Sequence, residues 1–175
     1  SGRLNYSWKI VTLDGLEVSS SSGLRLGADA RLSDAGGDIL MVMPSYEFLT
    51  HATVATSRAL RAAAKRFTTL AGLDTGSWLL AEAGLLDGHQ ATIHWDEIDR
   101  FSERFFEVHV QKEAVVFDRR RASCGGASTA FELALQLIGE AHGPTLRMRV
   151  ENLFMGAYSE RPDPQVGIVS RALQL

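Results

Sequence analysis

Three short segments combine polar or reactive side chains with glycines at points where a strand is expected to end. They are Leu73-Asp74-Thr75-Gly76, His94-Trp95 and Cys124-Gly125-Gly126-Ala127-Ser128. In an open parallel sheet, ligands bind at the carboxyl ends of the strands, where loops converge and helix N-termini direct free N–H groups at the opening. Glycines at a helix start also let a ligand approach the backbone closely. The sequence therefore predicts a small-molecule site at one edge of a sheet.

The elements that must position these segments follow from apolar runs that alternate with helical periodicity. Residues 38–43, DILMVM, are typical of a parallel strand covered on both faces, and residues 52–66 have apolar positions at helical spacing. Further strands are predicted at 68–73, 91–94, 106–110 and 114–118, and further helices at 77–86, 96–105, 128–141 and 144–158. This alternation predicts an α/β fold, a flavodoxin-like open sheet that is mostly parallel with helices on both faces.

The two ends of the chain have weaker patterns. Residues 6–13 are rich in β-branched and aromatic side chains and end at Asp14-Gly15, so a β-hairpin is predicted with its return strand at 17–22. Residues 159–175 contain proline and lack clear periodicity, which predicts a tail or linker. The basic run Arg119 to Arg121 could bind an anion but is interpreted as a solvated turn.

Composition excludes several classes of function. The 175 residues are 45% hydrophobic and carry a net charge of -3, which is typical of a globular domain and argues against a broad phosphate-binding surface. No apolar stretch approaches the ~20 residues that span a bilayer, and residues 1–5 have no apolar signal core. With Cys124 as the single cysteine, no internal disulfide is possible, and a reducing cytoplasm is expected. Neither a metal ion nor another cofactor is expected.

Two longer stretches resemble a known family. The sequence GLDTGSWLLAEAGLLDGHQATIHW at residues 72–95 and the sequence CGGASTAFELALQLI at residues 124–138 are similar to the DJ-1/PfpI-like domain of GlxA-type regulators in the AraC family. The resemblance covers roughly residues 6–158, which we interpret as one ligand-sensing domain. It implies that the family's first strand and helix precede this domain and that a helix-turn-helix domain follows the tail at 159–175.

The resemblance also bears on catalysis. Enzymes of this superfamily carry a nucleophilic cysteine at a strand-to-helix elbow and an assisting histidine about twenty residues later, positions that here are Asp74 and His94. A carboxylate is a poor substitute for a thiolate, and Cys124 lies on a different strand-to-helix connection. We therefore expect no catalytic residues. A hydrolase, hydratase or glyoxalase-type enzyme, and a pure dimerisation module, stay open as alternatives.

The same residues suggest what is bound. Asp74 offers negative charge to a cation, Trp95 or Tyr46 could face that cation with a ring, and helix starts at Gly76 and Ser128 would suit a carboxylate. Regulators that the chain resembles respond to glycine betaine, carnitine or arginine, so the resemblance also implies an amphoteric effector. A homodimer is expected, with DNA bound only through the helix-turn-helix domain. The predicted ligand-binding residues are Asp74, Thr75, His94, Trp95, Gly125, Gly126 and Tyr46. The alternatives are that Asp74 caps a helix, that His94 lies beneath a loop, and that Trp95 belongs to the core or a dimer interface.

Overall fold

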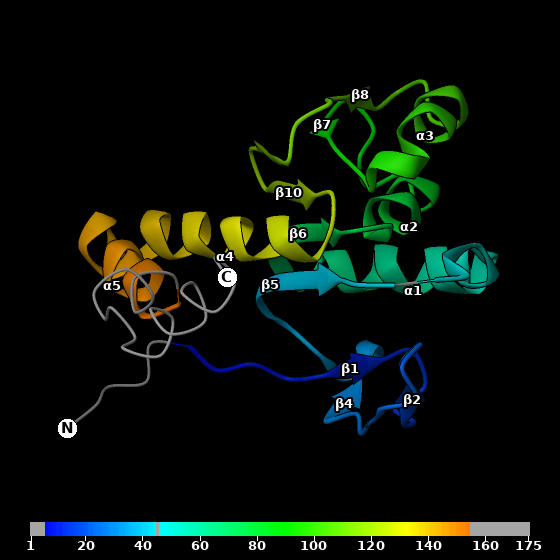
Figure 1. The fold of residues 1–175 in the computed structure, drawn as a ribbon. Coiled ribbons are helices and arrows are strands. Elements are labelled where there is room, and N and C mark those ends of the chain that lie inside the picture. The colour runs from blue at the N-terminus through cyan, green and yellow to red at the C-terminus, as the bar shows by residue number, and fades with distance from the viewer. Residues whose placement is uncertain (1–5, 45, 155–175) are drawn as a thin grey trace, which may run out of the picture. The chain divides into compact units, whose positions relative to one another are not determined.

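The computed structural model describes residues 6–44 and 46–154 (Figure 1). The chain divides into two compact units, residues 1–133 and 134–175, and the division falls within helix α4 (Ala127–His142). The predicted domain boundary at residue 158 lies outside the described residues.

A four-stranded sheet forms the centre of the first unit. It contains β5 (Gly37–Val42), β6 (Phe67–Leu73), β10 (Arg121–Cys124) and β9 (Val115–Asp118), in that order. The strands β5, β6 and β10 run parallel, and β9 pairs antiparallel with β10. Val42 is in register with Gly72, and Cys124 with Leu73, so the carboxyl ends of three strands meet at one edge. The predicted flavodoxin-like, mostly parallel α/β sheet is confirmed.

Two helices follow the parallel strands and contact β6. Helix α1 (Val54–Ala64) connects β5 to β6, and α2 (Gly76–Glu82) begins directly after β6. The hydroxyl of Thr53 caps α1 by accepting a hydrogen bond from the backbone N–H of Thr56 at 3.1 Å. Leu60 and Ala63 are buried one turn apart on α1, as the helical spacing predicted. Helix α2 is shorter than its predicted range of 77–86.

An aromatic cluster closes the core beside α2. The ring of Trp78 packs edge-on against Phe48, with ring centroids 5.4 Å apart, and against Phe105 at 5.1 Å. Phe48 comes from η2 (Phe48–His51), while Phe101 and Phe105 come from the region of α3 (Ile98–Arg104). Burial of several large rings stabilises this region and fixes the position of α2.

The segment before α3 differs from the prediction. Only Gln90–Ala91 forms a strand, β7, and it pairs in parallel with β8 (His109–Val110) in a separate two-stranded sheet. The predicted strand at 91–94 is therefore wrong beyond Ala91, because the backbone N–H of Thr92 donates to the side-chain hydroxyl of Ser123 in β10 and not to a main-chain carbonyl. The predicted helix at 96–105 is divided into η3 (Trp95–Glu97) and α3.

A hairpin is present near the N-terminus, but its turn is not at Asp14-Gly15. The hairpin joins β2 (Val18–Ser19) to β3 (Arg25–Leu26), with Gly23 in the left-handed region at a φ of 82°. At the predicted turn, the Asp14 carboxylate accepts a hydrogen bond from Leu16 N–H at 3.0 Å, a local turn that leads the chain away. Val11–Thr12, β1, instead pairs in parallel with β4 (Ala30–Arg31), which leads into η1 (Leu32–Asp34).

The second unit is described through the end of α5 (Pro144–Phe154). This helix begins at Pro144 as predicted, after Gly143 with a φ of 84°. Residues 155–158 of the predicted helix, and the predicted tail, lie outside the described residues. Within the described ranges, no helix has the length and hydropathy needed to cross a bilayer.

Candidate functional site

A sharp turn between β6 and α2 places Asp74 at the carboxyl edge of the sheet. Asp74 has a φ of 57°, in the left-handed region that Asp and Asn tolerate better than most side chains. Its backbone N–H donates to the carbonyl of Cys124 at 3.0 Å, and its carbonyl accepts from His94 N–H at 3.3 Å. The three segments singled out in the sequence are thus held together, backbone to backbone, through Asp74.

Two glycines make this elbow possible. A Cβ atom at Gly72 would lie 2.6 Å from the backbone nitrogen of Ser77, and one at Gly76 would overlap the carbonyl oxygen of Val42. Helix α2 can therefore start this close to β5 and β6 only with glycine at both positions. The Ser77 hydroxyl, fully buried, then donates to the Thr92 carbonyl at 2.7 Å and ties the elbow to the next loop.

His94 and Trp95 begin the short helix η3. The Nδ1 atom of His94 accepts a hydrogen bond from Asp96 N–H at 3.4 Å, so the ring caps η3. This acceptor role for Nδ1 places the proton of the neutral ring on Nε2, which is then a donor. The Trp95 side chain is 72% exposed, with its ring centroid 5.5 Å from that of His94. Trp95 is therefore not a core residue of this chain.

The start of α4 forms the opposite side of the site. Gly125 N–H donates to the carbonyl of Ala114 at 3.1 Å, and Gly126 N–H donates to the Thr129 hydroxyl at 2.9 Å. A Cβ at Gly126 would lie 3.9 Å from His94 Cδ2, so this backbone lies against the His94 ring. The first N–H groups of a helix have no intrahelical acceptors, and the helix dipole adds partial positive charge there.

An open cavity of about 590 Å³ lies between these two sides. His94, Trp95, Gly125 and Gly126, all predicted, line it together with residues that sequence reasoning missed. Ala127 and Ser128, which belong to the third segment singled out in the sequence, also line it. The missed lining residues, within the described part of the chain, are Thr92, Ile93, Ile98, Lys112, Glu113, Ala114 and Thr129. A cavity with a helix start, an imidazole, an exposed indole and one side chain of each charge can bind a small polar molecule.

The other predicted ligand-binding residues lie elsewhere. Asp74 is half-buried and is not among the lining residues, and Thr75 is buried with its hydroxyl directed at the Pro44 carbonyl, 3.4 Å away. Tyr46 is 81% exposed and is also not among them. Tyr46 lies on the loop after β5 and the cavity lies beside β10, so a role of Tyr46 in ligand binding stays a prediction.

Cys124 is not available as a replacement nucleophile. Its side chain is fully buried, and its Sγ lies 3.9 Å from the carbonyl oxygen of Gly126. Among the described residues, no group of three or more His, Cys, Asp or Glu side chains could hold a metal ion.

Residues 2–140 match the DJ-1/PfpI family. The chain belongs to this family. It is 39% identical to the HTH-type transcriptional regulator CdhR of Pseudomonas aeruginosa over 162 residues, which are 91% of this chain and 48% of that protein. It is 30% identical to the HTH-type transcriptional regulator GlxA of Rhizobium meliloti over 170 residues, 95% of this chain and 52% of that protein. The chain spans about half the length of these curated relatives.

Solved structures agree with this assignment. An AraC family transcriptional regulator from Pseudomonas putida is 27% identical, with a TM-score of 0.71 over 86% of this chain and 82% of that one. A ThiJ/PfpI family protein from Pseudomonas syringae shares the fold, with a TM-score of 0.75 at 24% identity over 89% of this chain and 64% of that one. The resemblance noted in the sequence is confirmed.

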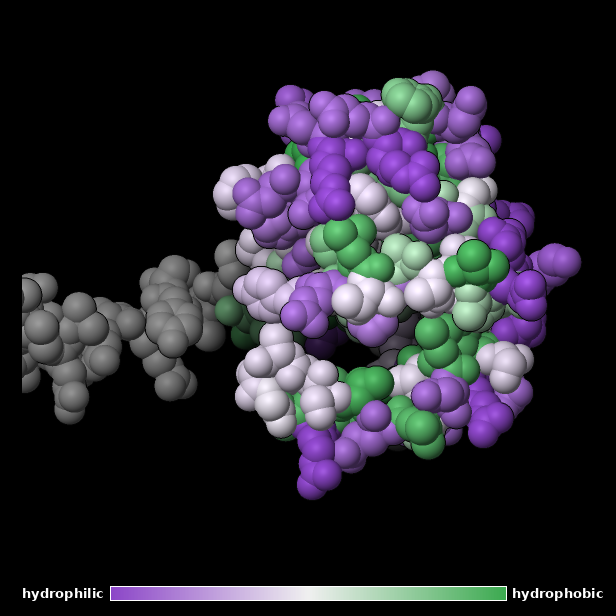
Figure 2. All heavy atoms as spheres, turned by 90° about the vertical axis from the view of Figure 1, so that its right-hand side faces the viewer, coloured by the Kyte–Doolittle hydropathy of each residue, from purple (hydrophilic) through white to green (hydrophobic). Residues whose placement is uncertain are grey.

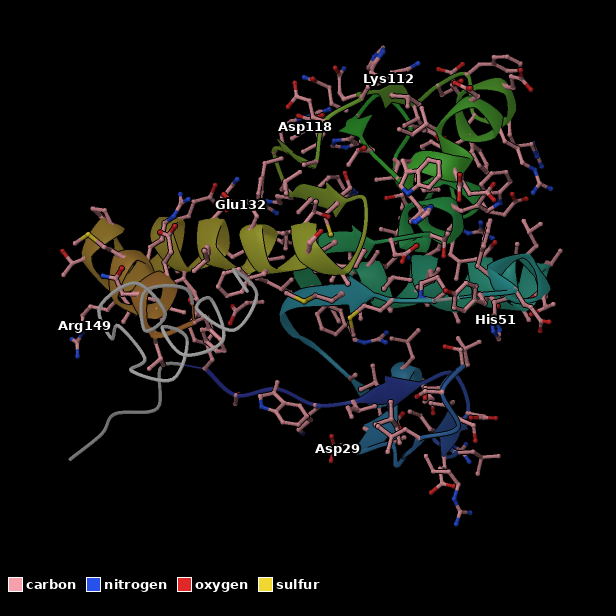
Figure 3. All side chains as sticks on the ribbon, viewed as in Figure 1. Asp29, His51, Lys112, Asp118, Glu132 and Arg149 are labelled. Carbon is pink, nitrogen blue, oxygen red and sulfur yellow. The ribbon has the colours of Figure 1, made fainter. Side chains whose placement is uncertain are left out.

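A charged cluster anchors the loops of the DJ-1/PfpI domain on the side away from the elbow. The Asp118 carboxylate accepts from Arg119 Nε at 3.0 Å and from Gln90 N–H at 2.9 Å, and lies 3.1 Å from His89 Nδ1 (Figure 3). The hydrogen bond from the Arg119 side chain, followed by that from Gln90, holds the pKa of Asp118 well below its usual range. These contacts join the β9–β10 turn to the start of β7.

The predicted turn is present at Arg119 and Arg120, which are both exposed, whereas Arg121 already belongs to a strand. Besides contacting Asp118, Arg119 donates to the carbonyl of Gly88 at 2.8 Å, and the half-buried Arg121 donates from Nε to the carbonyl of Leu85 at 2.6 Å. Arg121 is the first residue of β10. Arg119 and Arg121 thereby fasten the loop after α2 to the sheet.

A second cavity of about 510 Å³ lies beside α3, away from the elbow. Arg104 Nη2 is 3.3 Å from Glu82 Oε1, and Arg100 stacks over the Trp78 ring at 5.2 Å. The face toward which α3 and the start of α1 project is a mosaic of hydrophilic and hydrophobic residues (Figure 2). Three charged residues that line this second cavity, Glu82, Arg100 and Arg104, thus already contact other residues of this chain.

Proposed function

We propose that this DJ-1/PfpI domain is the effector-sensing part of an AraC-type transcriptional regulator. The observation that carries the proposal is the cavity beside an intact elbow in which a carboxylate, Asp74, occupies the turn while the thiol of Cys124 is buried. Such a site can bind a small molecule but has no exposed thiolate to react with it. The regulators named among the relatives support the same role.

The effector that the cavity suits is a small amphoteric metabolite of the betaine, carnitine or amino-acid kind. The exposed Trp95 ring can stack against a quaternary ammonium group, and the start of α4 can receive a carboxylate. Asp74 adds negative charge from below the His94 loop without lining the cavity. It acts on the cation through space and by holding His94 in place.

The remaining steps of regulation belong to the assembled protein. DNA is contacted by a helix-turn-helix domain in the other half of the regulator, in the cytoplasm. The sensing domain forms a homodimer, which matches a two-fold symmetric or repeated operator. Light scattering of this chain at high concentration tests the dimer, and a monomeric mass contradicts it.

Thermal unfolding tests the sensing function. A ligand that binds only the native state raises the unfolding midpoint in a saturable way. The panel contains glycine betaine, carnitine, arginine and related quaternary amines. Trp95→Ala and Asp74→Ala are expected to weaken the effect, and Trp8→Ala, which removes an 80% exposed ring that does not line the cavity, is expected to retain it.

The outcome separates the alternatives. If no compound in the panel shifts the midpoint of the wild-type chain at millimolar concentration, sensing of amphoteric metabolites is wrong. Equal responses in Trp95→Ala and Trp8→Ala would place the binding site elsewhere.

A superfamily enzyme is the second candidate, because His94 and the hydroxyl of Ser128 line the same cavity. A histidine can act as a general base toward a hydroxyl. The test is turnover of an amide or of methylglyoxal by the purified chain. Turnover that is lost in His94→Gln would favour this alternative.

A further inference from the structure

A buried hydroxyl of a residue that lines the cavity has no hydrogen-bond partner among the described residues. The side chain of Thr92 is 1% exposed, and its Oγ1 makes no hydrogen bond. Among the described residues, the only other buried side-chain atom of this kind is Glu97 Oε2, and that atom has Arg100 Nη1 at 3.7 Å. Buried polar groups are nearly always satisfied, so an orphan hydroxyl in a cavity wall points to a missing ligand group.

The position of Thr92 is fixed by its own backbone. Its N–H donates to the Ser123 hydroxyl at 2.9 Å, and its carbonyl accepts from the Ser77 hydroxyl at 2.7 Å. Both main-chain groups are therefore directed at β10 and α2, and Thr92 is one of the residues that line the cavity. His94, two residues later along an extended segment, lies on the same face and lines the same cavity.

The start of α4 lies in the same cavity wall. The backbone at Gly126 is against the His94 ring, and Ala127 and Ser128 contribute the first turn of a helix of 16 residues. One N–H of this start, that of Gly126, is capped by Thr129. The following N–H groups, the His94 ring and the Thr92 hydroxyl all belong to residues that line this one cavity.

The charges of the residues that line the cavity indicate which charge a bound ligand group should carry. Among the described lining residues, Lys112 and Glu113 carry opposite formal charges and cancel. What remains is the partial positive charge of the α4 start, which matches a single negative charge better than a dianion. Lys112 lies beside β8 (Figure 3), is exposed, and has its Nζ 3.8 Å from Asp99 Oδ1.

We propose that Thr92, His94 and the first turn of α4 form a carboxylate subsite, so that the effector is recognised as a monocarboxylate. Thr92 Oγ1 and His94 Nε2 donate to one carboxylate oxygen, and the backbone N–H groups of the α4 start donate to the other. The remainder of the effector extends toward Trp95. This subsite deepens the sensing function proposed above and rests on it for the identity of the effector.

The test compares matched pairs of probes by calorimetry on the whole chain. Glycine betaine and choline share the quaternary ammonium group and differ in the carboxylate, and acetate and acetamide differ likewise. The wild-type chain is expected to bind glycine betaine at least about tenfold more tightly than choline, since a hydrogen bond to a charged group is worth about that factor or more. Thr92→Val keeps the shape of the side chain and is expected to abolish most of this preference while leaving choline binding unchanged.

The thermal unfolding midpoint gives a second test, because loss of a hydroxyl that stabilises the fold would lower this midpoint. Because Thr92 Oγ1 has no partner in the free protein, Thr92→Val is expected to keep or raise the unfolding midpoint. Thr56→Val is the matched control, since its buried hydroxyl is bonded to that of Thr53 at 3.0 Å and its loss is expected to lower the midpoint. If Thr92→Val lowers the midpoint as Thr56→Val does, the hydroxyl is structural and the proposal is wrong.

The two proposals fail in different ways. Equal affinity for glycine betaine and choline overturns the carboxylate subsite and leaves effector sensing in place. If no onium compound binds, acetate alone is titrated to about 100 mM against the amide resonances of residues 125–129. Resonance shifts with acetate, but not with acetamide or inorganic phosphate, would support the carboxylate subsite without the proposed effector class. If acetate causes no shifts, both the carboxylate subsite and the proposed effector class are wrong.

Discussion

Adding a single methyl group at Gly76 tests whether α2 starts against β5 as described. In Gly76→Ala the new Cβ would overlap the carbonyl oxygen of Val42, with the Val42 carbonyl carbon at 2.9 Å and Pro44 Cδ at 3.4 Å. These are atoms of the main chain and of a proline ring, so no side-chain rotation relieves the clash. Overpacking a core usually costs ~1–3 kcal/mol, and because two backbone segments must separate here we expect about 3 kcal/mol or more. Domains of this size are stable by only ~5–15 kcal/mol.

Urea unfolding followed by circular dichroism measures this loss. A change of about 3 kcal/mol corresponds to a fall of roughly 6–12 °C in the thermal midpoint for a domain of this length. Gly27→Ala is the control, because nothing lies within 4 Å of a Cβ at that position and its φ is not positive. The control is expected to change stability by less than about 1 kcal/mol, and upward if at all. If Gly76→Ala unfolds within about 0.5 kcal/mol of the wild type, the close approach of α2 to β5 is wrong, and with it the geometry of the elbow.

Three further predictions concern the elbow, the charged cluster and the cavity. Asp74 has a φ of 57°, so the variant Asp74→Val is expected to be about 1–2 kcal/mol less stable than the variant Asp74→Gly in urea unfolding. Equal stability of the two variants would contradict the left-handed turn. Because the folded-state pKa of Asp118 is lowered, its contribution to stability is full above the ordinary carboxyl pKa near ~4 and is lost as the pH falls through the folded value. The midpoint of the wild type should therefore fall more steeply than that of Asp118→Asn between about pH 5 and 2, and parallel curves would refute this assignment. Gly126→Ala should unfold like the wild type, since His94 Cδ2 at 3.9 Å is an ordinary contact, yet bind effector more weakly in calorimetry because the methyl group enters the cavity; unchanged affinity would count against this wall as the binding surface.

The sequence predicted well those elements whose signals are local. The apolar run of β5 and the periodicity of α1 each appear within about fifteen residues, and both elements were found nearly in place. Strand β10 was missed because Arg119 to Arg121 resemble a solvated turn. Its first residue is charged, and its parallel pairing partner, β6, is about fifty positions away along the chain. The N-terminal hairpin was misplaced because an aspartate at a turn can bond its own neighbour as readily as it begins a hairpin.

For the candidate site, the sequence predicted which segments lie close together but not all of the residues that line the cavity. Strand ends of a parallel sheet converge, so His94 and Gly126 could be expected near each other from their places in the chain. Thr92 and Lys112 carry no such signal. One is distinguished by a hydroxyl that other elements leave without a partner, and the other lies on a loop whose position depends on β8 and β9. Both properties arise from tertiary packing, which sequence spacing does not encode.

The elbow retains its demanding geometry although Asp74 stands where the enzymes carry their nucleophile. The turn still requires a left-handed φ at Asp74 and glycine at positions 72 and 76. Such a conformation costs free energy for a non-glycine residue, so it persists only where surrounding contacts impose it. Here the two backbone groups of Asp74 bond Cys124 and His94, which sets the distance between the His94 loop and the start of α4. The geometry therefore has a use that does not depend on a thiol, because it holds the two walls of the cavity in register before any ligand arrives. Because the two walls are already ordered in the free protein, ligand binding does not carry the entropic cost of ordering them.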